Sequence, residues 1–148
     1  MLIENGFYMV LVTRMSKYNA KKVEYNGILF DSTVECEFYK FLEKQNNVGK
    51  FDRIEIQPRY ELIPKLDKQR KTEYIADFAL WKNDELIEVI DVKGMATETA
   101  KLKAKLFRYK YPDVELTWIC KAPKYTGKDW IDYDELKKVR RERKKAKE

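Results

Sequence analysis

Two carboxylates and one amine stand in apolar segments of this 148-residue chain, where charged side chains need a physical reason. Residues 86–93 are apolar and β-branched enough to predict a buried strand. Asp91 and Lys93 lie two residues apart near its end, so their side chains share one face of that strand. Asp77 is a second carboxylate in an equally apolar segment, residues 74–78. Two acids and a lysine on neighbouring strands could hold a divalent metal ion and the water it activates; the alternative for Asp91 and Lys93 is an ion pair at a strand end.

The chain contains no histidine, which excludes Ser-His and Cys-His nucleophiles, His-ligated zinc and a histidine general base. Its two cysteines, Cys36 and Cys120, are too few for a disulfide framework or a zinc site of usual spacing. We expect them to be reduced core residues of an intracellular protein. An enzyme with this sequence would therefore use carboxylates, lysines and a metal ion.

The formal net charge of +6 and the pI near 9.1 favour a polyanionic partner, of which nucleic acid is the commonest. The alternative from charge alone is a basic protein without such a partner. The apolar patch at residues 2–12 lacks a basic flank and a small-residue cleavage site, and it is too short to span a bilayer. We therefore expect a cytoplasmic protein without a membrane partner.

The elements that must position these residues follow the order αβββαβ. In sequence they are a helix ending near residues 46–47, strands at 54–62, 74–81 and 86–93, a helix at about 97–111, and a strand at 114–120. Ser32 and Glu35 form an S-x-x-E capping box at the start of the first helix. Pro58 interrupts the first strand and suggests an edge or a bulge. The helical crossover before the last strand predicts parallel pairing, which gives an α/β fold with a mixed four-stranded sheet flanked by helices.

We expect one core domain with short extensions. The units are a leader or edge-strand arm at 1–15, the core at 16–122 and a C-terminal extension with a basic tail at 123–148. Within the extension, a short helix should begin near Asp132 or Asp134, and its basic end at 140–145 should be frayed and solvated. Residues 65–71 read as an exposed, mobile basic connection.

The pairing of the two middle strands provides a geometric test. If Trp81 pairs directly with Leu86, Asp77 faces Ile90 instead of Asp91, and the acidic site is divided between the two faces of the sheet. Placing both aspartates on one face requires an odd-numbered loop, such as residues 83–85, or a β-bulge. We predict one of these two devices.

This order of elements, with Glu35 in the first helix, Asp77 on the second strand and Asp91-x-Lys93 on the third, resembles the PD-(D/E)XK nuclease superfamily. That superfamily has the restriction-endonuclease-like fold, which it shares with archaeal Holliday junction resolvases. Four segments over residues 16–120 are moreover similar to a small family of phage and prophage proteins, namely 26–32 with Glu35, 57–60, 74–78 and 91–94 with Thr97. Two positions depart from the pattern: Ile90 stands where that phage family often has another acid, and Ala76 replaces the motif proline.

The resemblance implies a Mg²⁺-dependent phosphodiesterase in which Mn²⁺ would substitute. Asp77 and Asp91 would bind the metal, with the Val92 carbonyl as a further ligand and Glu35 reaching it directly or through water. Lys93 would orient or help deprotonate the attacking water and stabilise the phosphorane. For Glu35 the helix cap is an equally good explanation, and the two roles are compatible.

Candidate DNA contacts lie beside this motif. Lys101, Lys105 and Arg108 share one face of the second helix, which is either an ordinary solvated face or a grip on backbone phosphates. Gln57 and Thr97 are further candidates, although a turn or sheet hydrogen bond explains Gln57 equally well.

Three functions remain open on this basis. The first is a DNA endonuclease acting as a homodimer on branched recombination, replication or packaging DNA, like a Holliday junction resolvase. The second is a non-catalytic DNA-binding protein with the same fold. The third is a structural or partner-binding protein, which would leave the acidic cluster unexplained.

Overall fold

The computed structural model describes residues 2–4, 9–12, 22–46 and 49–148, and the statements below concern these residues. The strands are β1 (Leu2–Glu4), β2 (Met9–Val12), β3 (Val23–Tyr25), β4 (Ile28–Phe30), β5 (Arg53–Ile56), β6 (Arg59–Ile63), β7 (Thr72–Ile75), β8 (Phe78–Lys82), β9 (Glu85–Val92), β10 (Leu116–Lys121) and β11 (Trp130–Asp132). The helices are α1 (Thr33–Gln45), α2 (Glu98–Lys110), the short 3₁₀ helix η2 (Lys124–Thr126) and α3 (Tyr133–Ala146).

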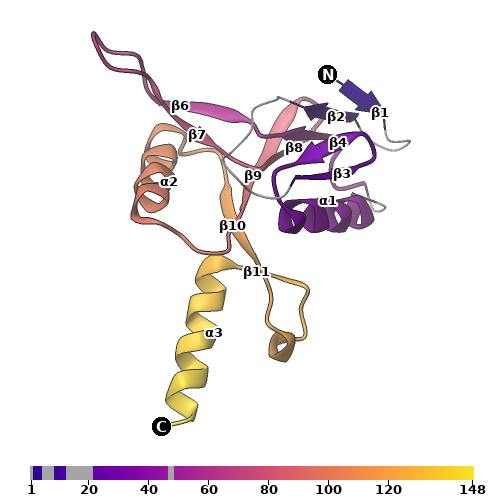
Figure 1. Cartoon of the computed structure of the whole chain (residues 1–148), viewed down its shortest axis with the longest axis vertical. Coiled ribbons are helices and arrows are strands. Elements are labelled where there is room, and N and C mark those ends of the chain that lie inside the picture. The colour runs from indigo at the N-terminus through magenta and orange to yellow at the C-terminus, as the bar shows by residue number, and fades with distance from the viewer. Residues whose placement is uncertain (1, 5–8, 13–21, 47–48) are drawn as a thin grey trace.

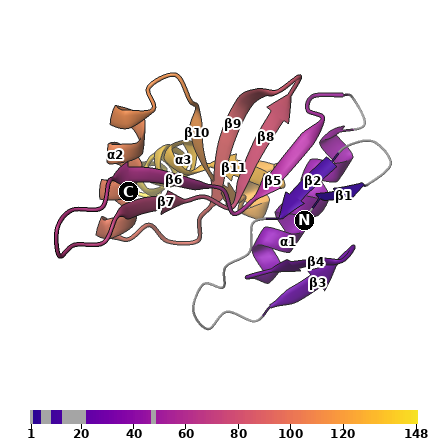
Figure 2. The same ribbon diagram turned by 90° about the horizontal axis from the view of Figure 1, so that it is seen from above.

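A mixed sheet organises the molecule, in the order β1-β2-β5-β8-β9-β10-β11 (Figures 1 and 2). Strands β2 and β5 pair in parallel, as do β9 and β10, and the other neighbours are antiparallel. The expected α/β fold is present: β5, β8, β9 and β10 are the four predicted core strands, in the predicted αβββαβ order with α1 and α2. The sheet extends beyond those four, through β1 and β2 at one edge and β11 at the other.

The two faces of the sheet carry separate apolar cores. On one face, Phe38 and Tyr39 of α1 pack with Phe78 and Ile90. On the other face, Phe107 of α2 packs with the neighbouring strand residues Ala79 and Val89. This division follows from the alternation of side chains along β8 and β9. Helix α1 begins as expected, because the Ser32 side chain accepts a hydrogen bond from the Glu35 N–H at 3.1 Å.

Both cysteines are buried free thiols, as expected of core residues. None of the helices in the described part of the chain is long and apolar enough to cross a membrane.

Two of the predicted strands are each divided in two. Between β5 and β6 the chain turns at Gln57, which has a left-handed φ of 53°, and Pro58. Between β7 and β8 it turns at Ala76 and Asp77. As a result β6 and β7 pair only with each other, in a hairpin that projects from the body beside α2 (Figure 2). Its tip at 64–71 is exposed as expected, and Leu66 pairs with Gln69 within it.

Of the two devices predicted for the β8–β9 pair, the β-bulge is present and the odd-numbered loop is not. Asn83 and Asp84 form a two-residue turn with φ values of 51° and 62°, which is typical of a type I′ hairpin. Trp81 pairs with Leu86 but Leu80 pairs with Glu88, so one residue, Ile87, bulges out of the ladder. Beyond the bulge, Phe78 pairs with Ile90, and the next position brings Asp77 level with Asp91.

The C-terminal extension is more regular than the sequence indicated. Helix α3 begins where expected, with the Asp132 side chain as its N-cap, but the expected fraying over 140–145 is wrong, because the helix continues to Ala146. Tyr133, Leu136 and Val139 anchor its first turns on Cys120 and Ile131. The rest of α3 extends away from the body (Figure 1).

Candidate active site

Asp77 and Asp91 come together in the interior, where they are 2% and 3% exposed. Asp77 lies at the turn between β7 and β8, and its backbone N–H donates to the Ile90 carbonyl at 3.1 Å. Its carboxylate accepts a hydrogen bond from the Val92 N–H at 2.8 Å, which fixes it against the end of β9. Its carboxyl group is also within hydrogen-bonding reach of Asp91. The structure therefore brings the two predicted carboxylates into direct contact.

Lys93 completes this pair, as the two-residue spacing predicted. Its Nζ lies 2.8 Å from Asp91 Oδ2 and 5.1 Å from the centre of the Trp118 ring. Trp118 lies on β10, directly across from Asp91 in the parallel ladder. The ring face favours a cation, so Lys93 is held between an anion and an aromatic surface, with part of its side chain in solvent.

A hydrogen-bond chain through Tyr74 supports Asp91 from the other side. The Tyr74 hydroxyl donates to Asp91 Oδ2 at 2.7 Å and accepts from Trp118 Nε1 at 2.8 Å. Burial and then the charge of Asp91 raise the pKa of Tyr74, so its hydroxyl stays protonated and acts as a donor. From the sequence, Tyr74 and Trp118 could only be placed on two separate predicted strands, because nothing in the local pattern links them.

These neighbours determine the charge state of Asp91. Burial raises its pKa, but the hydrogen bond with Asp77, the charge and hydrogen bond of Lys93, and the Tyr74 hydroxyl outweigh burial and hold the pKa of Asp91 below its usual range. Asp91 is therefore an ionised carboxylate in contact with a second carboxyl group. Such a contact requires either a shared proton or a cation.

Gln57 has a structural role beside the pair. Its side-chain amide donates to Asp31 Oδ2 at 2.5 Å, and its backbone N–H donates to the Asp77 carbonyl at 2.9 Å. Asp31 and Gln57 are 6% and 8% exposed, so this contact joins the start of α1 to the turn that carries Asp77. The sheet hydrogen bond considered for Gln57 is thus present, whereas its predicted DNA contact stays a prediction. Asp31 is thus a further buried carboxylate, linked to the site through Gln57.

Glu35 lies in the first turn of α1, half-buried. In the part of the chain that the structure describes, no three Asp, Glu or Cys side chains form a group that could hold a metal ion. A metal at this site would therefore depend on the Asp77–Asp91 pair in the first instance, and the direct or water-mediated role of Glu35 stays a prediction.

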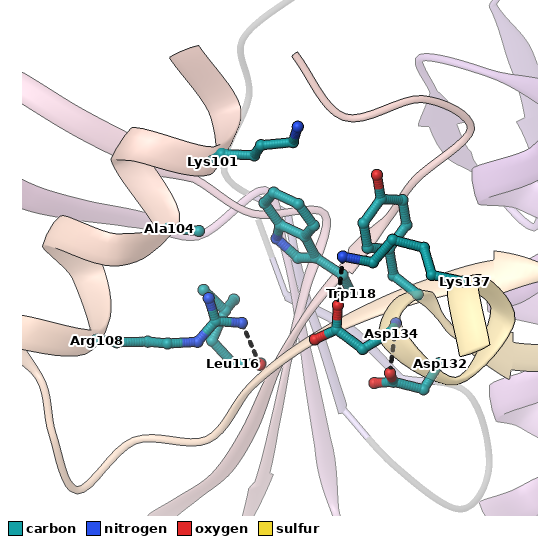
Figure 3. A pocket seen from close by; sticks show the side chains of 9 residues that line it. Lys101, Ala104, Arg108, Leu116, Trp118, Asp132, Asp134 and Lys137 are labelled. Atoms are coloured by element: carbon teal, nitrogen blue, oxygen red, sulfur yellow. Dashed lines mark hydrogen bonds and ion pairs between the residues drawn. The ribbon is translucent and has the colours of Figure 1, made fainter. Parts of the chain in front are cut away.

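A cavity of about 290 Å³ lies between α2 and α3, with Trp118 at its floor (Figure 3). Two of the predicted DNA contacts, Lys101 and Arg108, line it from α2, and Lys137 lines it from α3. Asp132 and Asp134 line it as well, and Lys137 is paired with Asp134 at 2.8 Å (Figure 3). Sequence reasoning missed Lys137, which lies in the predicted short helix just before the basic run at 140–145. Lys105 is exposed on α2 without lining this cavity, and Thr97 accepts a hydrogen bond from the Ala100 N–H as the N-cap of α2.

The fold and the site define a mixed α/β protein with a buried pair of carboxylates and a lysine at the end of a central strand. The chain belongs to the family described as "Protein of unknown function (DUF1064)", whose model matches residues 15–127. That match covers the predicted core and ends before α3. Comparisons with curated proteins and with solved structures gave no match.

Proposed function

We propose that this protein is a metal-dependent DNA endonuclease of the PD-(D/E)XK type. The observation that carries the proposal is the contact between Asp77 and Asp91, both buried, with Lys93 bound to Asp91 at 2.8 Å. Burying an ionised carboxylate is costly, and placing a second carboxyl group against it adds to that cost. Proteins accept such an arrangement mainly where the charges perform chemistry.

The residues present fit Mg²⁺, with Mn²⁺ as a substitute. Mg²⁺ prefers oxygen ligands, retains several waters and is commonly held by one or two carboxylates together with substrate phosphates, so it does not need a third acidic ligand. Asp77 and Asp91 would hold it, with the Val92 carbonyl next along the strand and Glu35 as a further direct or water-mediated ligand. A bound metal would lower the pKa of its water and offset charge on the phosphate oxygens.

The side chains around the pair supply the remaining functions. Lys93 places a positive charge beside Asp91, where it would orient a water molecule and stabilise a phosphate group that gains negative charge. Tyr74 holds Asp91 in one orientation by donating to its Oδ2, and Trp118 holds Tyr74 in turn. This chain of two hydrogen bonds gives the reactive carboxylate a rigid support.

A DNA substrate is supported by the net charge of +6 and by Lys101 and Arg108 at the cavity next to Trp118. Branched DNA of recombination or replication, in a phage or prophage context, is the proposed target, and cutting both strands of a junction would require a homodimer. Such a protein would act in the cytoplasm of a bacterial host. These finer assignments rest on the family resemblance, which is an analogy of fold.

The test is cleavage of a labelled four-way junction and a matched linear duplex in Mg²⁺, Mn²⁺ or EDTA, with Asp91→Asn and Lys93→Ala variants. Metal-dependent cutting that both variants lose is expected, and symmetric nicking of the junction alone would identify a junction resolvase. Equal cutting of both substrates would support the nuclease and contradict junction specificity. If folded, metal-supplied protein cuts neither substrate, the nuclease proposal is wrong, and DNA binding in EDTA would then favour the non-catalytic DNA-binding protein.

A further inference from the structure

Helix α3 ends in a segment that contributes to none of the apolar cores formed by the described residues. Every residue from Arg140 to Glu148 is exposed, and the last α3 residue packed against the sheet is Val139. The segment 140–148 carries six cations and two acids, and Arg143 lies 3.8 Å from the centre of the Tyr125 ring. Isolated helical turns are marginal in water, and cations spaced three or four residues apart on a helix repel each other. A partner that neutralises these charges would stabilise the segment.

The cations of α3 form a continuous row that begins inside the cavity next to the candidate active site. Lys137 lines that cavity. Arg141 and Lys145 follow at four and eight residues, and Arg140 and Lys144 follow at three and seven, so all lie on the face of Lys137. We call these five side chains the α3 basic row. At about 1.5 Å per residue the row is about 12 Å long, which corresponds to about three or four base pairs of a duplex.

The inner end of the row is connected to the acidic pair. Trp118 lines the cavity (Figure 3), and its Nε1–H donates a hydrogen bond to the Tyr74 hydroxyl. The Tyr74 hydroxyl in turn donates to Asp91, and the Lys93 ammonium group lies over the Trp118 ring. A DNA strand with its reacting phosphate at Asp91 and Lys93 would therefore pass the cavity lined by Lys101, Arg108 and Lys137 before it reaches the exposed part of α3.

We propose that the α3 basic row binds the backbone of the double-stranded DNA arm that leaves the active site, with the cavity between α2 and α3 holding its first phosphate. This inference takes the position of the reacting phosphate from the proposed nuclease function. The α3 basic row itself lies outside residues 15–127, which the family model matches. Double-stranded DNA suits the surface because the row presents cations at regular helical spacing, of which Lys137 would exchange its pairing with Asp134 for a phosphate. A lipid bilayer suits it poorly, because the exposed segment has Ala146 as its only apolar side chain and so lacks a face to insert.

The test measures DNA affinity without cleavage, by fluorescence anisotropy of a labelled duplex in EDTA over a series of KCl concentrations. The variant Arg141→Gln/Lys145→Gln removes two cations of the row and keeps good helix formers at exposed positions. The matched control is Lys44→Gln/Lys50→Gln, which removes the same charge from two exposed positions, one in the last turn of α1 and one in the connection that follows it. Helix α1 covers the other face of the sheet. Equal thermal midpoints would confirm that both variants fold.

We expect the slope of log K against log salt to become shallower by about 1.8 in the α3 variant, which is the value for two lost phosphate contacts, and to be unchanged in the control. At about 0.1 M salt the α3 variant should bind about tenfold or more weakly. Equal slope changes in both variants, an unchanged slope in the α3 variant, or no duplex binding by the wild type would overturn the proposal. Tighter binding of a matched RNA duplex would overturn the assignment to DNA.

The outcomes separate this proposal from the nuclease proposal. A slope change confined to the α3 variant supports the binding surface even if the protein cuts nothing. Metal-dependent cutting together with an unchanged slope overturns the binding surface and leaves the nuclease intact.

Discussion

The Tyr74 hydroxyl is the part of the site whose energetic contribution can be worked out most directly from the structure. Tyr74 is 3% exposed, donates to ionised Asp91 and accepts from Trp118 Nε1. Tyr74→Phe keeps the ring and its packing against Phe107, so it creates no cavity. It removes a hydrogen bond to a charged group, which typically contributes about 1.5–3 kcal/mol, and leaves a buried indole N–H unpaired, at a cost of about 1–3 kcal/mol. Because the two terms share one atom they do not fully add, and we expect a loss of about 3 kcal/mol.

Tyr60 provides a matched control. It lies directly opposite Tyr74 in the β6–β7 pair and packs on the same Phe107 ring. Among the described residues, however, its buried hydroxyl has no hydrogen-bond partner. Tyr60→Phe therefore removes a polar group whose burial is already unfavourable, and it should leave stability unchanged or raise it.

Urea unfolding at neutral pH, followed by circular dichroism, measures both changes. Since a domain of this size is typically stable by about 5–15 kcal/mol, a loss of about 3 kcal/mol would shift the midpoint clearly while the protein still folds. Two variants that differ by less than about 0.5 kcal/mol would refute the assigned roles of the two hydroxyl groups.

Two other perturbations test the sheet that carries the site. Burial raises the pKa of Glu88; the Thr117 hydrogen bond opposes this shift and the charge of Glu115 reinforces it. The folded protein should therefore lose stability as the pH rises from the ordinary glutamate pKa of about 4.3 through the raised pKa of the folded state, because Glu88 then ionises in a buried position. Glu88→Gln should thus be more stable than wild type at pH 7 and similar to it below about pH 4 in urea unfolding, and a pH-independent difference would contradict the shift. Deletion of Ile87, the 41% exposed bulge residue, should leave the pairing on both sides in place and cost about 1 kcal/mol or less in thermal unfolding. Deletion of Val89 should cost several kcal/mol, because the ladder would then move Glu88 into its buried position, and equal effects of the two deletions would refute the register.

Local patterns were sufficient to predict the elements that position the site. The Ser32 cap, the hairpin between β8 and β9, and the shared face of Asp91 and Lys93 each depend on spacing over a few residues. An irregularity between β8 and β9 could also be predicted from residue counting. Without one additional residue in β9 or in the turn, Asp77 would pair with Ile90 and lie on the opposite face of the sheet from Asp91. The predicted carboxylates could be placed together for that reason.

The division of the second predicted strand was not predictable, because backbone pairing across the division stays complete. The Ala76 N–H donates to the Pro58 carbonyl in the projecting hairpin, and the Asp77 N–H donates to the Ile90 carbonyl in the sheet. Consecutive residues thus exchange one partner strand for another without an unpaired donor, a glycine or a proline to mark the change. The first strand carried a visible signal at Pro58, and the break beside it was expected there.

The contacts that make the site rigid lie beyond the range of sequence patterns. Tyr74 and Trp118 are 44 residues apart and meet only because β9 and β10 pair in parallel beneath the hairpin that carries Tyr74. The strand change at Asp77 is what makes this contact available, since it releases β7 from the sheet and turns Tyr74 back over Asp91. The same change leaves the Asp77 carboxylate to accept the Val92 N–H at 2.8 Å, outside the regular ladder. The strand change at Asp77, which no local pattern predicts, is therefore what turns two acidic residues on neighbouring strands into a pair held by hydrogen bonds.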